Sequence, residues 1–163
     1  MSLAPRTPDL KANLGVSNGA FGTIISTGSI GSIIMLLIGG QIVHRIGAKR
    51  ALQIGSTGIS LTYSLLVHTR SPMLFVLLNI TAGACISIYH IASSGHTLHR
   101  QDELGRVIIP KLHGAWGVGA MSTAAIAFAI STHISIALHI TALMIIVWLL
   151  TQFSIIKLSN TFP

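Results

Sequence analysis

The chain has 163 residues, of which 51% are hydrophobic and only 8% charged, and its mean hydropathy is +0.76. Soluble domains carry about 25% charged residues, so this composition excludes a water-soluble globular domain and predicts an integral membrane protein. The net charge of +7 comes from short clusters of cations between apolar runs, a distribution that favours membrane topology over nucleic-acid binding.

Residues 1–18 are polar and predict an external, loop-like segment. A helix needs about 20 apolar residues to cross a bilayer, and about five segments of the remaining chain approach that length. The sequence therefore predicts an all-α, polytopic membrane helix bundle over residues 19–157 and a short tail at 158–163. The expected spans are 19–43, 51–69, 72–98, 112–132 and 134–156.

A basic turn separates the first two spans. Arg45, Lys49 and Arg50 fall between two long uncharged runs, where a cluster of cations marks the cytoplasmic side of a membrane. Gly47 lies among them and allows the positive φ that a sharp reversal needs.

The loops carry unequal numbers of cations. One side of the membrane collects seven, and the other collects Arg6, Lys11 and Arg70. The majority side is expected to be cytoplasmic, which places the N-terminus outside and the C-terminus inside a cell (inner or plasma) membrane. The seven are Arg45, Lys49, Arg50, Arg100, Arg106, Lys111 and Lys157.

Small residues recur in the first and fourth spans, including Gly28 and Gly31 in the first and Gly114, Gly117 and Gly119 in the fourth. Such residues allow close helix packing in membranes. The last span is almost uniformly apolar, which is typical of an outer, lipid-facing helix.

Polar side chains concentrate in the third span. At 3.6 residues per turn, Asn79, His90 and Ser93 fall near one face, and a polar stripe within a span is expected to face the bundle interior or a water-filled cavity. Tyr89 lies beside them in sequence. Further along, His113 and Trp116 begin the fourth span.

The turn at 40–50 resembles the signature loop between the second and third helices of the major facilitator superfamily. Its pattern of two glycines and three cations matches at Gly40, Arg45, Gly47, Lys49 and Arg50, whereas His44 stands where the family usually has Asp. The segment from Pro5 to Ser17 and the start of the fourth span also resemble a bacterial sugar/fucose-permease-like branch.

This resemblance implies that the five spans correspond to the second to sixth of about twelve helices. The first helix and everything after the sixth are then expected to be missing. The implied function is a piece of a secondary transporter that moves a small solute by alternating access and is inactive alone, with the bilayer, the solute and the missing half of a split transporter as partners. Residues 40–50 are implied to form a conformational latch.

The implied cavity lies along the fourth family helix, which corresponds to the third span here. In that branch an Asp and an Asn are usual four residues apart, but this chain has Ile86 and His90. The residues expected to line the cavity are Asn79, Tyr89, His90, Ser93, His113 and Trp116.

Eight histidines leave an alternative open. His96 and His99 are three residues apart and, with His90, form the basis of a second hypothesis, a non-transporting membrane module that binds haem or a metal. No Cys or acidic residue joins them in the pattern, and we expect neither a cofactor nor enzymatic activity, because the chain has no acid pair, nucleophile–base arrangement or phosphate loop.

Overall fold

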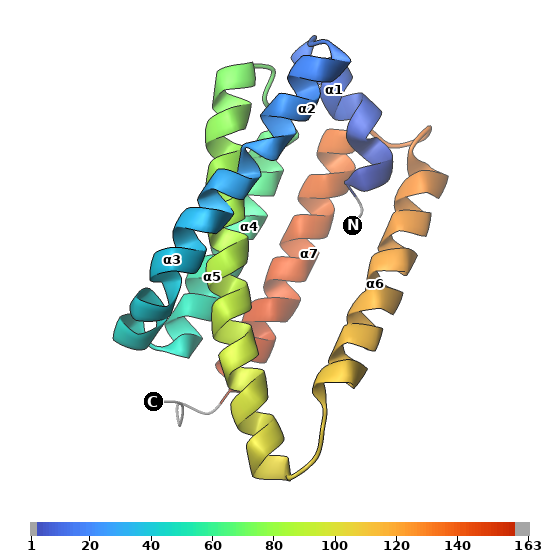
Figure 1. Cartoon of the computed structure of the whole chain (residues 1–163). Helices are drawn as coiled ribbons and strands as arrows, with labels where there is room; N and C mark the ends of the chain where they lie inside the picture. Colours follow the sequence, from blue (N-terminus) through green and yellow to red (C-terminus); the bar gives the residue numbers. More distant parts are fainter. Residues whose placement is uncertain (1–2, 159–163) are drawn as a thin grey trace.

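The computed structural model describes residues 3–158, and every regular element in them is helical, which confirms the all-α prediction. The part of the predicted tail at 159–163 lies outside the described residues. The long helices run alternately down and up the bundle (Figure 1). In chain order the elements are η1 (Ala4–Arg6), α1 (Thr7–Leu14), α2 (Asn18–Ser26), α3 (Gly28–Ile46), α4 (Ala48–Leu66), α5 (Pro72–Leu104), α6 (Ile109–Ile130) and α7 (Ile136–Ile156).

Four helices of the described chain are long and apolar enough to cross a membrane: α2 with α3 as one stretch (Asn18–Ile46), α5, α6 and α7. The structure differs from the predicted five spans at α4, whose 19 residues include Lys49 and Arg50 in the first turn and several hydroxyl groups further along. Because α4 runs between α5 and α7 and is packed against both, it shares their environment despite its lower hydropathy.

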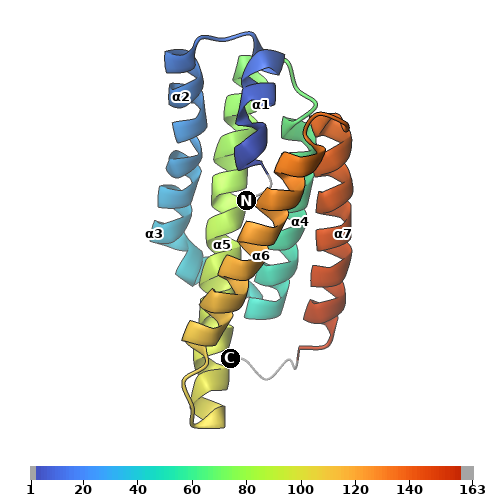
Figure 2. The same cartoon turned by 90° about the vertical axis from the view of Figure 1, so that its right-hand side faces the viewer.

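Helix α5 is the centre of the bundle, with α3 and α4 packed along it and α7 on the far side of α4 (Figures 1 and 2). Its 33 residues give a length of about 50 Å at 1.5 Å per residue, whereas the hydrocarbon core is about 30 Å thick. The helix therefore extends beyond the bilayer, and the charged segment around Asp102, expected to be a loop, forms its last turns.

Glycines make the contact between α3 and α5 unusually close. A Cβ added to Gly31 would lie 1.9 Å from the backbone oxygen of Ile80, and one added to Gly83 would lie 2.0 Å from that of Gly28. Ser32 Oγ donates a hydrogen bond to Gly83 O at 3.1 Å across the same contact. The small residues predicted to mediate packing do so at this crossing.

The N-terminal segment is helical and packed, in contrast to the predicted loop. Leu10 and Leu14 of α1 are buried in a cluster that also contains Phe21, Phe75 and Ile140. Gly15, with φ +63°, ends α1 in a left-handed conformation, and Ser17 Oγ then caps α2 by accepting from Ala20 N. Residues near the N-terminus thereby cover one end of the bundle.

Helix α6 stands apart from the other long helices (Figure 1). It contacts α5 and η1, and a Cβ on Gly114, Gly117 or Gly119 would meet nothing within 4 Å. The close packing predicted for these three glycines is therefore not made within the described chain, and most of the α6 surface is exposed.

Candidate functional site: a polar groove and a basic turn

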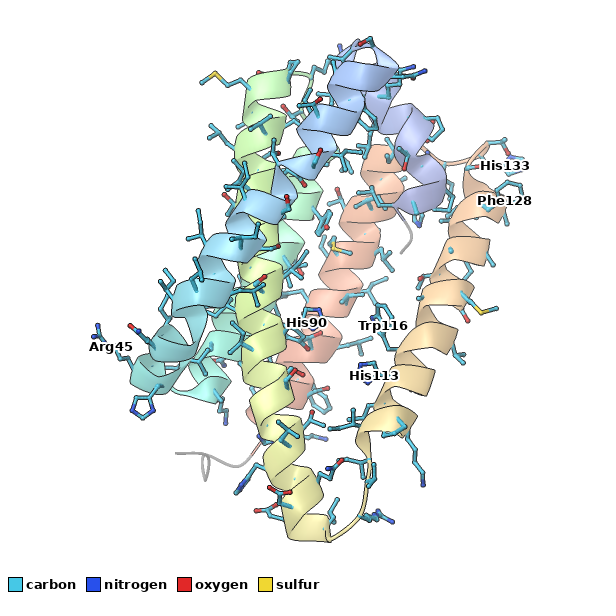
Figure 3. All side chains as sticks on the ribbon, viewed as in Figure 1. Arg45, His90, His113, Trp116, Phe128 and His133 are labelled. Carbon is cyan, nitrogen blue, oxygen red and sulfur yellow. The ribbon has the colours of Figure 1, made fainter. Side chains whose placement is uncertain are left out.

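A groove of about 470 Å³ lies between α5 and α6. His90 points from α5 toward α6, while His113 and Trp116 point from α6 toward α5 (Figure 3). Four of the six residues expected to line a cavity meet here. The full lining is His90, Ser93, Ser94, Thr97, Leu98, Ile109, Leu112, His113 and Trp116.

The groove offers hydrogen-bonding groups without a fixed charge. Its lining contains two imidazoles, three hydroxyls and an indole, and no carboxylate. His113 Nδ1 lies 3.1 Å from Ile109 O, so Nδ1 carries the proton and Nε2 remains available as an acceptor, or as a donor once the ring is protonated. Ser94 and Thr97 were not predicted as cavity residues. They follow His90 by four and seven residues, a spacing that places them on the same helical face as His90.

Two predicted cavity residues lie elsewhere. Tyr89 packs toward α4, where its Cβ would be 2.9 Å from a Cβ on Gly55, although its ring still meets the edge of His90 with centroids 6.4 Å apart. Asn79 lies three turns from His90 and contacts the junction of α2 and α3 instead. Sequence periodicity alone does not separate these faces, because neighbouring helices approach α5 from several sides.

The side chain of Asn79 forms hydrogen bonds with the first span at the point where its helix is interrupted. The helix is interrupted at Thr27, between α2 and α3. The amide Nδ2 of Asn79 donates to Ile24 O at 3.2 Å, Ile25 O at 2.7 Å and Thr27 Oγ1 at 3.3 Å. Carbonyls released by a helix break inside a membrane need a replacement donor. The side chain of Asn79 supplies a donor to Ile25 O, and it shares Ile24 O with the Thr27 hydroxyl, which donates at 2.6 Å. Gly28 leaves room for the Asn79 side chain, since a Cβ there would lie 3.2 Å from it.

The basic turn contains one residue between two helices. Gly47 has φ +85° and ψ 147°, which confirms the predicted positive φ, and this region is essentially restricted to glycine. His44, Arg45 and Arg50 are exposed around it, with Arg45 pointing away from the bundle (Figure 3). A Cβ on Gly40 would meet nothing within 4 Å.

Lys49 connects this turn to the end of α7. Its Nζ donates to Ile156 O at 3.2 Å and to Leu158 O at 3.1 Å. Free carbonyls and the helix dipole make the C-terminus of a helix a favourable place for a cation. The seven cations counted on one side of the membrane accordingly lie at the end of the bundle where α3, α5 and α7 finish (Figure 1).

Hydrogen bonds join one face of α7 to α4, while apolar side chains on the rest of the helix, such as Ile146 and Leu150, are exposed. Trp148 Nε1 donates to Thr57 Oγ1 at 2.9 Å, and Gln152 Nε2 donates to the same oxygen at 2.9 Å. The spacing of four places both donors on one face of α7, a signal that was present in the sequence.

The histidines of the alternative hypothesis do not form a metal centre within residues 3–158, where no group of three His, Cys, Asp or Glu residues could hold an ion. His99 Nε2 lies 3.2 Å from Glu103 Oε1, two turns or more beyond His90.

Long apolar helices around α5 define a multi-pass, α-helical membrane protein. The model of the MFS_1 like family matches residues 10–103, which is 94 of the chain's 163 residues. The chain belongs to this family of the major facilitator superfamily.

Two relatives agree with this assignment. An uncharacterised MFS-type transporter of Yersinia pestis is 24% identical over 72% of this chain and 31% of its own length. A gallate transporter of Pseudomonas putida is 32% identical over 48% of this chain and 18% of its own length. The chain thus spans less than a third of the relatives it matches, and no solved structure matches it. Neither relative is named a sugar or fucose permease, so that branch stays a prediction.

Proposed function

We propose that this chain forms one wall of the solute path of a secondary-active transporter that works by alternating access. The observation that carries the proposal is the α5–α6 groove, which gathers His90, Ser93, His113 and Trp116 between two otherwise apolar helices. Polar residues at membrane depth are expensive unless they face a cavity. The family to which the chain belongs supports transport as the use of that cavity.

Water access to the groove tests this proposal. On a Cys85→Ala background, a cysteine at His90 should react with a membrane-impermeant thiol reagent in the reconstituted protein. A cysteine at Phe128, which is 74% exposed and points away from the groove on α6, serves as the lipid-facing control (Figure 3). Equal protection of both positions would show that the groove is not a hydrated path.

We propose a plasma-membrane or inner-membrane location with the basic turn in the cytoplasm. The unequal distribution of cations supports this orientation. In intact cells, a cysteine at His133, in the α6–α7 turn, should be labelled from the medium. A cysteine at Arg45 should be labelled only after permeabilisation, and the reverse pattern would invert the topology.

The turn at 40–50 is proposed to act as a conformational latch through Gly40, His44, Arg45, Gly47, Lys49 and Arg50. The glycine-only conformation of Gly47 supports a fixed geometry, and the Lys49 contact couples the turn to α7. His44 replaces the usual acidic residue of the family, so the latch here depends on cations and helix termini rather than on a fixed negative charge.

Further helices, in the same or another polypeptide, are proposed to complete the path, and the 163-residue chain alone is not expected to transport. The exposure of α6 and the open side of the groove support this. Such helices would cover polar groups that otherwise face lipid at a cost of several kcal/mol. Saturable uptake of solute into proteoliposomes containing only this chain would contradict the proposal.

The name of one relative, the gallate transporter of Pseudomonas putida, suggests gallate as the first solute to test. Gallate is an aromatic carboxylate, and the groove presents imidazole donors and the face of Trp116 without a competing carboxylate. Quenching of Trp116 fluorescence in a Trp148→Phe background should be saturable with gallate and weaker with its uncharged amide. Equal quenching by gallate and its amide would show that the carboxylate does not contribute to recognition.

A further inference from the structure

A second groove lies between α4 and α7, and neither α3 nor α6 lines it. It has a volume of about 190 Å³, and its surface is almost entirely apolar. Leu61 and Ser64 of α4 and Met144, Ile145 and Trp148 of α7 are among the residues that line it. The hydrogen bonds between α7 and α4 hold its two walls together, and the polar face of α5 has no part in it.

The walls of this groove suit an apolar occupant. Leu61 and Ile145 are 58% and 53% exposed, although both lie on helices of the membrane-spanning bundle. The indole N–H of Trp148 is already bonded to Thr57 Oγ1 at 2.9 Å, so the ring offers apolar surface to the groove. At membrane depth such a surface faces the acyl chains of lipids.

Arg50 lies on the same face of α4, at the end nearest the basic turn. It precedes Leu61 by eleven residues and Ser64 by fourteen, which are close to three and four helical turns, and it is exposed. At 1.5 Å per residue, Leu61 is about 16 Å from Arg50 along the helix. This length is about half of a hydrocarbon core of about 30 Å, so the charge and the groove are separated as the headgroup and acyl chain of one lipid are.

The charge of Arg50 is not compensated within the part of the chain that the structure describes. Of the three acidic residues, Asp9 lies on α1 at the opposite end of the bundle, and Asp102 and Glu103 lie on the last turns of α5. No ion pair between described residues involves Arg50.

Lys49 adds a second positive charge at the same end of the groove. Its Nζ is held by the carbonyls of Ile156 and Leu158 at the end of α7, so this ammonium lies between the two helices that form the walls. Clusters of cations beside a membrane-spanning segment attract anionic lipid headgroups, and the guanidinium of arginine forms charge-assisted hydrogen bonds with phosphate.

We propose that the α4–α7 groove holds an acyl chain of an anionic phospholipid whose phosphate binds Arg50, with the Lys49 ammonium beside it. A zwitterionic headgroup brings its own cation to a place without a carboxylate, so an anionic headgroup is preferred. One cation near a membrane surface corresponds to a preference of about fivefold for an anionic lipid. The bound lipid would brace α4 against α7.

Trp148 reports the occupant because it lines the groove. In a Trp116→Phe background, the full chain in neutral detergent micelles is titrated with phosphatidylglycerol whose brominated acyl chains quench an adjacent indole. Phosphatidylcholine with the same brominated chains is the comparison. Half-maximal quenching of Trp148 is expected at about a fivefold lower mole fraction of phosphatidylglycerol.

Variants at the basic turn make the test specific to the groove. Arg50→Gln should bring the two lipids to equal quenching, whereas Arg50→Lys should retain most of the preference. Arg45→Gln removes an equally exposed cation from α3, which does not line the groove, and should leave the preference intact. In the chain with Arg50, salt raised from about 0.1 to about 1 M should reduce the preference, because the Debye length shortens from about 10 to about 3 Å.

Three results would overturn the proposal. Equal quenching by the two lipids in the chain with Arg50 would mean unselective contact with surrounding lipid. Loss of the preference in Arg45→Gln as large as in Arg50→Gln would mean a general attraction to the basic turn. Quenching that falls as the chain is concentrated at a fixed lipid fraction would mean that a second copy covers the groove. None of these results bears on the α5–α6 groove, whose access to water is tested separately.

Discussion

Replacing Gly31 with alanine tests whether the α3–α5 contact stabilises the bundle. The added Cβ would lie 1.9 Å from Ile80 O, whereas ordinary van der Waals contact begins at 3.4 Å, so the helices must separate by about 1.5 Å (3.4 minus 1.9). The obstacle is backbone, which cannot rotate away as a side chain can. Such a separation also disrupts the 3.1 Å hydrogen bond from Ser32 to Gly83 O.

The expected loss combines two terms. Overpacking costs about 1–3 kcal/mol, and an interhelical hydrogen bond in a membrane is worth about 0.6 kcal/mol, so Gly31→Ala should lower the free energy of unfolding by about 1.6–3.6 kcal/mol. Equilibrium unfolding in mixed micelles of a mild detergent and sodium dodecyl sulfate, followed by circular dichroism, measures it.

Gly117 provides the matched control, because a Cβ there meets nothing within 4 Å. Gly117→Ala should be neutral or slightly stabilising, since alanine favours a helix by about 0.5–1 kcal/mol over glycine. Equal stability of the Gly31 and Gly117 variants would refute the close crossing of α3 and α5.

Three other contacts give testable expectations. Asn79→Leu removes the donor that Asn79 supplies to Ile25 O, while Ile24 O still accepts from Thr27, and it should cost about 1–3 kcal/mol of unfolding free energy in the same assay. Thr57→Val removes the acceptor shared by Trp148 and Gln152, so the emission of Trp148 in a Trp116→Phe background should shift as its N–H loses this bond. Lys49→Met uncaps α7 and should speed hydrogen exchange in its last turn by several-fold, consistent with about 0.5–1 kcal/mol for a cation at a helix C-terminus.

Each expectation has a control on the same helix. Thr81→Val on α5 removes a hydroxyl that donates only to its own helix, at Leu77 O. If it lowered the free energy of unfolding as much as Asn79→Leu does, the hydrogen bonds of Asn79 at the helix break would not explain the loss. Thr62→Val on α4 removes a hydroxyl that donates to its own helix, at Gly58 O and Ile59 O, and should leave the emission of Trp148 nearly unchanged. Arg50→Met should leave exchange in α7 unchanged; slower or equal exchange in Lys49→Met would rule out the cap.

The sequence by itself determined the membrane-spanning class and the position of the sharp turn. A composition with 8% charged residues cannot cover a soluble surface, and the cations of 40–50 and the glycine among them identify a helix reversal by local chemistry alone. These properties depend on neighbours in the chain, so no tertiary information was needed. The same is true of the polar face of α5 at His90 and Ser93, which follows from helical periodicity.

The tertiary structure decided which face each helix presents to which neighbour. Asn79 shares a helix with His90 but supports a break in another span, and Trp148 of the otherwise apolar α7 bonds to Thr57 of α4. Arg6 is buried only because a segment 128 residues away in sequence supplies Ile134 O. Contacts of this kind depend on the rotation and separation of helices, which are set by glycine crossings such as Gly31 with Ile80, and the sequence pattern of a single helix does not contain them.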